Sequence, residues 1–151
     1  MALRNLGVRF RSLAPQIETL GWARTASSAP SVYDKIIEIT VIDKDGRRHA
    51  LRGVTGQNLA ELLAAHVDTL GDDAVAGSPE GRGSVEAHVK VPNEMLVKVP
   101  APAGDDQVFL SELAGSGTVD VHSRLASRIV LDKDMQGTLV ALGELSPWKT
   151  L

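Results

Sequence analysis

The sequence predicts an α+β protein of the β-grasp class, in which a β-hairpin is followed by one amphipathic helix laid across the sheet. Three observations predict this class: an alternating apolar segment, a D-x-D-G turn directly after it, and a helical stripe of leucines. The length of 151 residues favours one domain. The apolar fraction of 43% and the mean hydropathy of -0.01 are typical of a globular chain.

The hairpin is expected at residues 33–53. Residues 33–42 alternate in apolar character, which is the period of a strand. The apolar face carries Ile37, Ile39 and Val41. Residues 43–46, DKDG, form the expected turn, because Gly46 can adopt a positive φ. Residues 47–53 then return as the second strand.

A helix is expected within residues 54–66. Thr55 is the expected N-cap, because its hydroxyl can accept a hydrogen bond from a free backbone N–H of the first turn. Apolar residues then recur at i, i+3 and i+4, with a histidine at i+7: Leu59, Leu62, Leu63 and His66. This spacing predicts one apolar stripe facing the sheet.

The second half of the chain has shorter elements. Residues 67–84 lose the helical period and contain glycines and a proline, so a long loop is expected there. Residues 85–91 alternate in apolar character and predict a strand. One helical turn is expected in residues 109–113, followed by two strands, around Ile129 and around Leu139.

The first 31 residues differ in composition from the rest. They carry four arginines, a single acidic residue and a Ser/Ala-rich patch, which is typical of a mitochondrial transit peptide. The alternative is a flexible basic arm on the mature protein. We therefore expect residues 1–31 to be this segment and residues 32–151 to be the folded domain with its C-terminal tail.

The folded part of the chain is acidic. The whole chain has 16 basic and 19 acidic residues; residues 1–31 hold 4 and 1 of these, which leaves 12 and 18, or -6. Nucleic-acid binding requires clustered Lys and Arg, so nucleic acid is not an expected partner. No apolar run reaches 18 residues, and the chain contains no cysteine, which excludes disulfides and thiolate ligands.

Two stretches resemble a known family. Residues 39–66, ITVIDKDGRRHALRGVTGQNLAELLAAH, resemble the opening of mitochondrial, adrenodoxin-like [2Fe-2S] ferredoxins. In that family three cysteines follow the helix in the spacing C-x5-C-x2-C, and the fourth follows Arg-Leu-Gly. Alignment on the family's Glu-Gly and Arg-Leu pairs puts Pro79, Val85 and His88 at the loop positions and Ser127 at the fourth.

The residues at these four positions do not suit an iron–sulfur cluster. Such a cluster is held by four thiolates, and even a Rieske centre retains two. A serine hydroxyl is a poor ligand for a soft metal. The resemblance therefore implies the ferredoxin-like β-grasp fold, and the chemistry predicts that no cofactor and no cluster is present.

A narrower resemblance covers the end of the chain. Residues 122–151, HSRLASRIVLDKDMQGTLVALGELSPWKTL, and residues 92–102, PNEMLVKVPAP, resemble the ferredoxin-like subunit of respiratory complex I in plants and green algae. This implies an accessory subunit on the matrix side of the mitochondrial inner membrane, in a bridge between the matrix arm and the membrane arm. The implied partners are complex I subunits, namely a mitochondrial acyl carrier protein, its LYR-motif partner and the γ-carbonic anhydrase module. Association with the membrane would then occur only through the complex.

Partner contacts are expected in the long loop and in the tail. The residues proposed for these contacts are Gly77, Ser78, Pro79, Glu80, Gly81, Pro147 and Trp148. Trp148 is the expected anchor, because large aromatic side chains dominate binding energies. No serine lies in a G-x-S-x-G motif and no P-loop spacing occurs, so neither a catalytic residue nor an enzyme is predicted.

Two alternatives remain open at the level of sequence. A single metal ion could bind through His88 and nearby acidic residues, although the simpler interpretation of His88 is an ordinary half-exposed strand residue. The chain could also act as a free-standing, ubiquitin-like adaptor in the matrix. Our preferred interpretation has no metal site.

Overall fold

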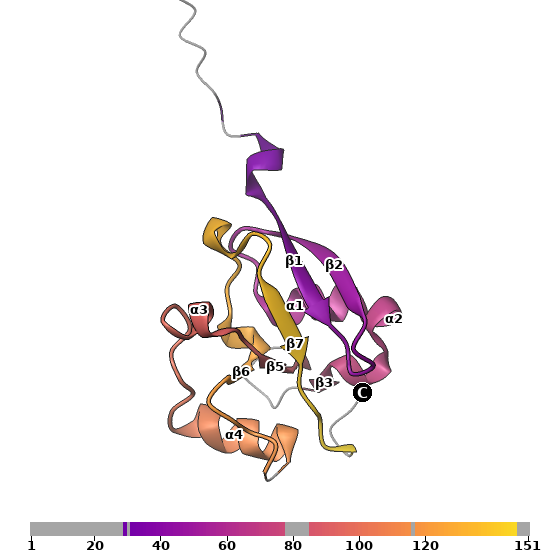
Figure 1. Cartoon of the computed structure of the whole chain (residues 1–151), viewed down its shortest axis with the longest axis vertical. Helices are drawn as coiled ribbons and strands as arrows, with labels where there is room; N and C mark the ends of the chain where they lie inside the picture. The colour runs from indigo at the N-terminus through magenta and orange to yellow at the C-terminus, as the bar shows by residue number, and fades with distance from the viewer. Residues whose placement is uncertain (1–28, 30, 78–84, 116, 148–151) are drawn as a thin grey trace, which may run out of the picture.

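The computed structural model describes residue 29 and residues 31–77, 85–115 and 117–147 (Figure 1). Its main sheet has five strands in the order β2-β1-β7-β5-β6. The strands are β1 (Ile36–Ile42), β2 (Arg48–Val54), β5 (His88–Lys90), β6 (Ser123–Leu125) and β7 (Leu139–Leu142). β1 and β7 run parallel, whereas the other neighbours are antiparallel. A separate two-stranded pair joins β3 (Ala76–Gly77) to β4 (Val85–Glu86).

Within the described residues, four α-helices and four short 3-10 turns accompany the strands. The helices are α1 (Leu59–Ala65), α2 (Val67–Leu70), α3 (Asn93–Leu96) and α4 (Asp105–Ala114). The 3-10 turns are η1 (Val32–Lys35), η2 (Asp72–Ala74), η3 (Ala126–Arg128) and η4 (Lys133–Met135). Within the described residues, no helix combines the length and the apolar character needed to cross a membrane.

The predicted hairpin is confirmed. Ile37, Ile39 and Val41 of β1 are buried, as their alternation predicts. In the turn, the Gly46 N–H donates to the Asp43 carbonyl at 3.1 Å, and Gly46 has φ +82°. A residue with a side chain is strained at this φ, so glycine allows the tight return into β2.

The α1 helix has the predicted leucine stripe but a different N-cap. Leu59, Leu62 and Leu63 are buried against the sheet. Asn58 is the cap, because its Oδ1 accepts from the Glu61 N–H at 2.8 Å. The Thr55 hydroxyl instead donates to the Lys35 carbonyl at 3.0 Å, so the prediction of Thr55 as N-cap was wrong.

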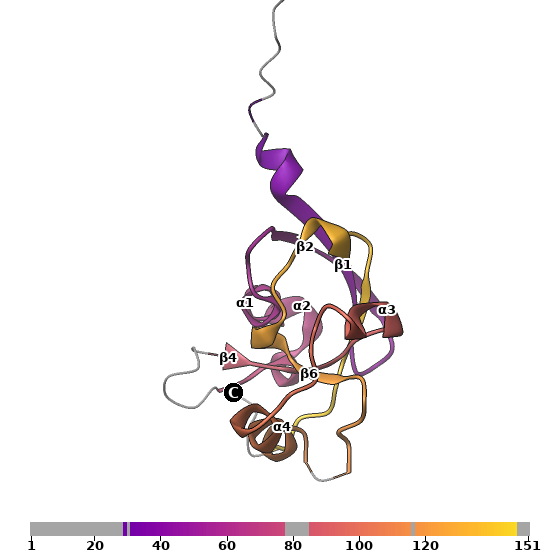
Figure 2. The same cartoon turned by 90° about the vertical axis from the view of Figure 1, so that its left-hand side faces the viewer.

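Two apolar clusters form the core. The larger lies between α1 and the sheet and contains Ile37 and Leu63. The smaller lies around α4 and contains Phe109, Leu113 and Leu125. Figures 1 and 2 show α4 below the strands, next to β6, and α1 behind the β1–β2 hairpin. The hairpin, the helix packed on a mixed sheet and the parallel β1–β7 pair confirm the β-grasp prediction.

Three predictions about the second half need correction. Residues 67–77 form α2, η2 and β3 rather than irregular loop, and α4 is ten residues long instead of a single turn. The strand expected around Ile129 does not form there; β6 lies just before this segment and ends at Leu125. Residues 129–131 leave the sheet because their backbone pairs with the segment before α1: the Leu59 N–H donates to the Ile129 carbonyl, and the Leu131 N–H to the Gln57 carbonyl, both at 2.8 Å. The strand at Leu139 is confirmed as β7.

Candidate functional site

Ser127 lies in η3, directly after β6, and is held by the side chain of Glu86. The Ser127 N–H donates to Glu86 Oε1 at 2.9 Å, and the Ser127 hydroxyl donates to Glu86 Oε2. The Ala87 N–H donates to Glu86 Oε1 at 3.1 Å. One carboxylate thus receives three hydrogen bonds and connects β4 to η3. Next to it, the Ala126 N–H donates to the Ala87 carbonyl at 2.9 Å.

Glu86 has no exposed surface. Burying a carboxylate is costly unless hydrogen bonds replace the lost water, and here two backbone N–H groups and one hydroxyl do so. Hydrogen bonds to an ionised carboxylate are also stronger than hydrogen bonds between neutral groups. Ser127, which aligns with the family's fourth cysteine, is therefore hydrogen-bonded to Glu86 in a connection between β4 and η3, which we call the brace.

The loop positions of the predicted site are only partly described. Val85 begins β4, is half-buried and pairs with Gly77 of β3. Pro79 and the other expected contact residues Ser78, Glu80 and Gly81 lie outside the described residues. The described part of the loop therefore consists of its two ends, which β3 and β4 hold together.

His88 is buried in β5 with 1% of its surface exposed, so the interpretation of a half-exposed strand residue was wrong. Its Nδ1 lies 2.9 Å from the Glu144 carbonyl, and its Nε2 lies 2.9 Å from Ser123 Oγ. Because a carbonyl only accepts, Nδ1 carries the proton. In the neutral ring Nε2 then accepts from the Ser123 hydroxyl, whose one hydrogen also has Asp120 Oδ1 within reach at 3.2 Å. The ring lies against Gly143, where an added Cβ would overlap it. Burial lowers the pKa of His88, which favours this neutral form.

The described residues at these positions do not fit a [2Fe-2S] cluster. The whole chain has no cysteine, whereas a cluster of this kind requires four thiolates. Ser127 gives its hydroxyl hydrogen to Glu86, and both ring nitrogens of His88 already have protein partners. Within the described parts of the chain, no group of three or more His, Asp or Glu side chains has the geometry of a metal site.

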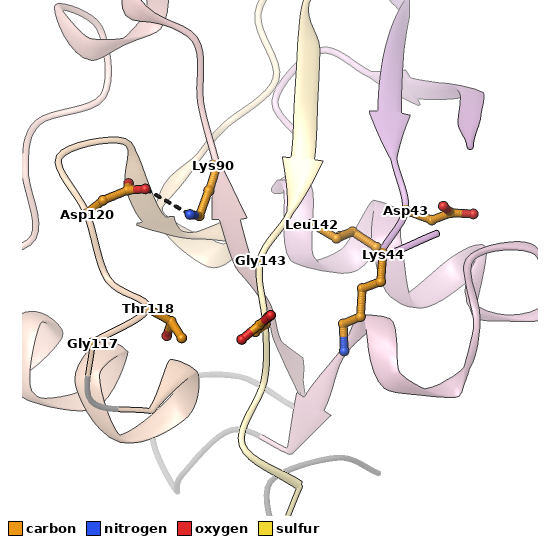
Figure 3. Close-up of a pocket in the computed structure, with 9 residues that line it drawn as sticks. Asp43, Lys44, Lys90, Gly117, Thr118, Asp120, Leu142 and Gly143 are labelled. Carbon is orange, nitrogen blue, oxygen red and sulfur yellow. Dashed lines mark hydrogen bonds and ion pairs between the residues drawn. The ribbon is translucent and has the colours of Figure 1, made fainter. Parts of the chain in front are cut away.

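A polar hollow of about 490 Å³ lies between the β1–β2 turn, β5 and the chain after β7. Figure 3 shows Lys90 and Asp120 joined on one side of it and Lys44 on the other. Lys90 Nζ donates to Asp120 Oδ2 at 2.8 Å, and this bond lowers the pKa of Asp120 to about 2. Lys44 pairs with Asp73 at 2.9 Å. Both lysines are already paired with carboxylates, so the hollow gives no indication of an anionic ligand.

The described part of the tail is fastened to α4. The Ser146 N–H donates to the Leu113 carbonyl at 2.7 Å, and the Ser146 hydroxyl donates to the Glu112 carbonyl at 3.2 Å. Leu145 belongs to the apolar cluster around α4. Pro147 follows on the exposed surface, and Trp148 lies outside the described residues. The expected contact residue Pro147 is thus presented by a fixed segment.

Comparison with known proteins supports the ferredoxin resemblance. The chain is 31% identical over 108 residues to adrenodoxin-like protein 1, mitochondrial, of Drosophila melanogaster, which covers 72% of this chain and 59% of that protein. The chain therefore spans less than two thirds of this relative. No family model matches the sequence.

Solved structures give the same fold. A ferredoxin from Rhodopseudomonas palustris has a TM-score of 0.52 and 21% identity, over 76% of this chain and 99% of that one. A reduced Cys-to-Ser variant of putidaredoxin from Pseudomonas putida has a TM-score of 0.53 and 22% identity, over 70% and 95%. The fold of this chain is that of the [2Fe-2S] ferredoxins, as the resemblance implied.

The sequence pattern did not predict that Glu86 and Arg124 are buried, the two buried Asp, Glu, Lys or Arg residues within the described part of the chain. Glu86 left a detectable signal, because an acidic residue interrupts the short strand pattern of residues 85–91. Arg124 was noted only as part of an Arg-Leu pair that places Ser127. Its burial next to Leu125 follows from the packing of α4 and the α3–α4 segment, which no local pattern indicates.

Proposed function

We propose that this chain is an accessory structural subunit of mitochondrial respiratory complex I that carries no iron–sulfur cluster. In this role it is part of a bridge between the matrix arm and the membrane arm, on the matrix side of the inner membrane. Its proposed partners are the mitochondrial acyl carrier protein, its LYR-motif partner and the γ-carbonic anhydrase module. The role consists of binding, and no catalytic step is assigned to the chain.

One observation carries this proposal. The fold of an electron carrier is retained, yet the whole chain lacks cysteine, and Ser127 is hydrogen-bonded to the buried carboxylate of Glu86. A domain that kept this fold to carry electrons would need thiolate ligands. A domain that keeps it for its shape needs only a rigid scaffold and accessible loops. The brace supplies a connection between β4 and η3 without a metal.

Two further observations support a mitochondrial location. The similar Drosophila protein is named as mitochondrial, and residues 1–31 have the arginine-rich, acid-poor composition of an import signal. The membership in complex I rests on the resemblance of residues 92–102 and 122–151 to the bridge subunit of plants and green algae.

The decisive experiment is native electrophoresis of mitochondria from cells that have a plant-type complex I and express the tagged full chain. We expect the tag to migrate with complex I and the purified chain to contain no stoichiometric iron and no reducible chromophore. A tag found only at low mass would indicate a free-standing adaptor instead. Two irons per chain with a reducible chromophore would contradict the cluster-free part of the proposal.

A truncated chain that ends at Ser146 tests whether the tail anchors the chain in the complex. It retains Leu145 and both hydrogen bonds of Ser146 to α4, so its domain should unfold at nearly the same temperature as the full chain. Removal of the expected contact residues Pro147 and Trp148 should lower the amount of chain in the complex. If the truncated chain assembles at the normal level, the tail does not act as the anchor.

A further inference from the structure

Two hollows adjoin on the side of the molecule that carries α3, β6 and α4, the side that Figure 2 presents to the viewer. The first has a volume of about 520 Å³ and lies between the α3–α4 segment and β6. The second has a volume of about 660 Å³ and extends toward η4. The hollows share Val99 and Arg128 in their walls, so they form one continuous surface, which we call the VPAPA surface after residues 99–103.

The VPAPA surface is largely apolar. Residues 99–103 and Leu125 line the first hollow, and Val130, Leu131 and Met135 help to line the second. Val130 of the second hollow is 56% exposed, and Val97, two residues before Val99 in the sequence, is 92% exposed. Apolar side chains gathered at adjoining hollows are typical of a site that binds another protein.

Arg124 gives this surface its chemical preference. Only 5% of Arg124 is exposed, and it lines the first hollow. Its Nε donates to the Val99 carbonyl at 3.2 Å, and its Nη1 donates to the carbonyls of Val121 and Ser123 at 2.9 and 2.7 Å. Among the described residues, its Nη2 has no hydrogen bond, and no carboxylate forms an ion pair with it. The carbonyls orient the guanidinium but do not neutralise its charge.

The neighbouring charges do not compensate Arg124. Asp106 lines the same hollow, but Arg128 pairs with it. Arg128 Nε lies 2.9 Å from Asp106 Oδ2, and Arg128 Nη2 donates to Asp106 Oδ1 at 2.9 Å. Lys98 and Asp134 in the second hollow pair with each other at 3.0 Å. Asp132 also lines the second hollow, and its Oδ1 accepts from the Lys133 N–H at 2.7 Å. Of the described cations in the walls, Arg128 and Lys98 have carboxylate partners and Arg124 has none, so the group that matches Arg124 is a carboxylate.

We propose that the VPAPA surface is the docking site for a segment of a partner protein whose apolar side chains fill the two hollows and whose single Asp or Glu pairs with Arg124. This rests on the proposed function, because it assigns the chemistry of one partner contact to a surface other than the loop and the tail. A planar guanidinium that is already oriented loses little freedom on pairing with a carboxylate, which makes Arg a favoured centre of an interface.

The test uses the isotope-labelled full chain and two synthetic peptides with blocked ends, Leu-Val-Glu-Val-Leu and its twin Leu-Val-Gln-Val-Leu. We expect the Glu peptide to shift the NMR signals of the Arg124 Nε–H and of the Ala101 and Ala103 amides. The Gln twin should bind about tenfold or more weakly, because it lacks the charge that pairs with the guanidinium. Equal binding of both peptides, or shifts confined to another face, would refute the proposal.

A hollow-filling variant keeps the test independent of Arg124, whose loss could unfold the domain. Ala101→Phe places a ring in the first hollow and leaves the hydrogen bonds of Arg124 in place, so it should abolish binding of the Glu peptide. Ala50→Phe is the matched control, because exposed Ala50 lies on β2 at the opposite edge of the sheet, and it should bind as the unchanged chain does.

Two further outcomes are informative. Butyrate that produces the same shifts at the same concentration as the Glu peptide would indicate a small-molecule anion site and overturn the proposal of a protein segment. Migration of the full chain with complex I combined with no binding of the Glu peptide would refute the VPAPA surface alone. The proposed function would fail separately, by the absence of that migration.

Discussion

The brace between Glu86 and Ser127 predicts a large loss of stability in the variant Glu86→Ala. The substitution leaves the N–H groups of Ala87 and Ser127 without their acceptor. Each unsatisfied buried donor costs about 1–3 kcal/mol, so the two together cost about 2–6 kcal/mol. Removing a buried carboxylate recovers part of this through its desolvation, and we expect a net loss of about 2–4 kcal/mol.

The variant Glu86→Gln is the matched control. Its amide oxygen can still accept from both N–H groups, and its amide nitrogen can donate to the Ser127 hydroxyl. The loss is then limited to the difference between charged and neutral hydrogen bonds, about 1 kcal/mol. Ser127→Ala removes a single donor and should also cost about 1 kcal/mol.

The free energy of unfolding is measured by urea titration monitored by circular dichroism, with the slope checked for equality among the variants. A typical domain has about 5–15 kcal/mol of stability, so a loss of about 2–4 kcal/mol is easily resolved. If Glu86→Ala costs less than about 1 kcal/mol, or if Glu86→Gln costs as much as Glu86→Ala, the carboxylate does not hold β4 to η3.

Three further predictions concern the same domain. Burial lowers the pKa of His88 below its usual 6.5, so the unfolded chain takes up the proton more readily than the folded chain does. The free energy of unfolding should therefore fall as the pH drops below about 6.5. His88→Gln should flatten this dependence, which is measured by urea titrations at about pH 7.5 and about pH 5.5. Gly143→Ala should destabilise the domain by about 2 kcal/mol or more, seen as a lower melting temperature, because its Cβ would overlap the buried His88 ring. Asn58→Ala should cost about 1 kcal/mol by loss of the α1 cap, whereas Asn58→Asp should retain most of it.

Each of these predictions has an outcome that contradicts it. A His88→Gln variant with the same pH dependence as the unchanged chain would show that another group titrates. A Gly143→Ala variant of unchanged melting temperature would mean that the ring can move aside. If Asn58→Ala and Asn58→Asp are equally stable, the side chain of Asn58 does not cap α1.

The periodic elements could be predicted from the sequence because their causes are local. The alternation of Ile37, Ile39 and Val41 defines a strand with one buried face, and Gly46 allows the turn that follows. The leucine stripe from Leu59 to Leu63 defines the apolar face of α1 in the same way. The boundaries were less accurate, since Thr55 and Asn58 are both good caps and the contact of Thr55 with the distant Lys35 decides between them.

The errors occur where a distant segment competes for the backbone. Residues 129–131 have strand-like side chains, but their N–H and carbonyl groups pair with Gln57 and Leu59, far away in the sequence. His88 follows an alternating pattern that suggests partial exposure, yet the chain after β7 and Ser123 of β6 contact its buried ring. A pattern of apolar residues states which face can be buried, but not which neighbour will bury it.

The sequence by itself determined the hairpin, the helix stripe and the absence of thiolate chemistry, because these depend on residue type and short spacing alone. Only the tertiary structure decided that Ser127 meets Glu86, 41 residues away, and that Arg124 enters the wall of a hollow without a carboxylate partner among the described residues. The physical reason is that a buried charge is tolerated according to the donors and acceptors around it, and chain segments bring those groups together only when the domain folds.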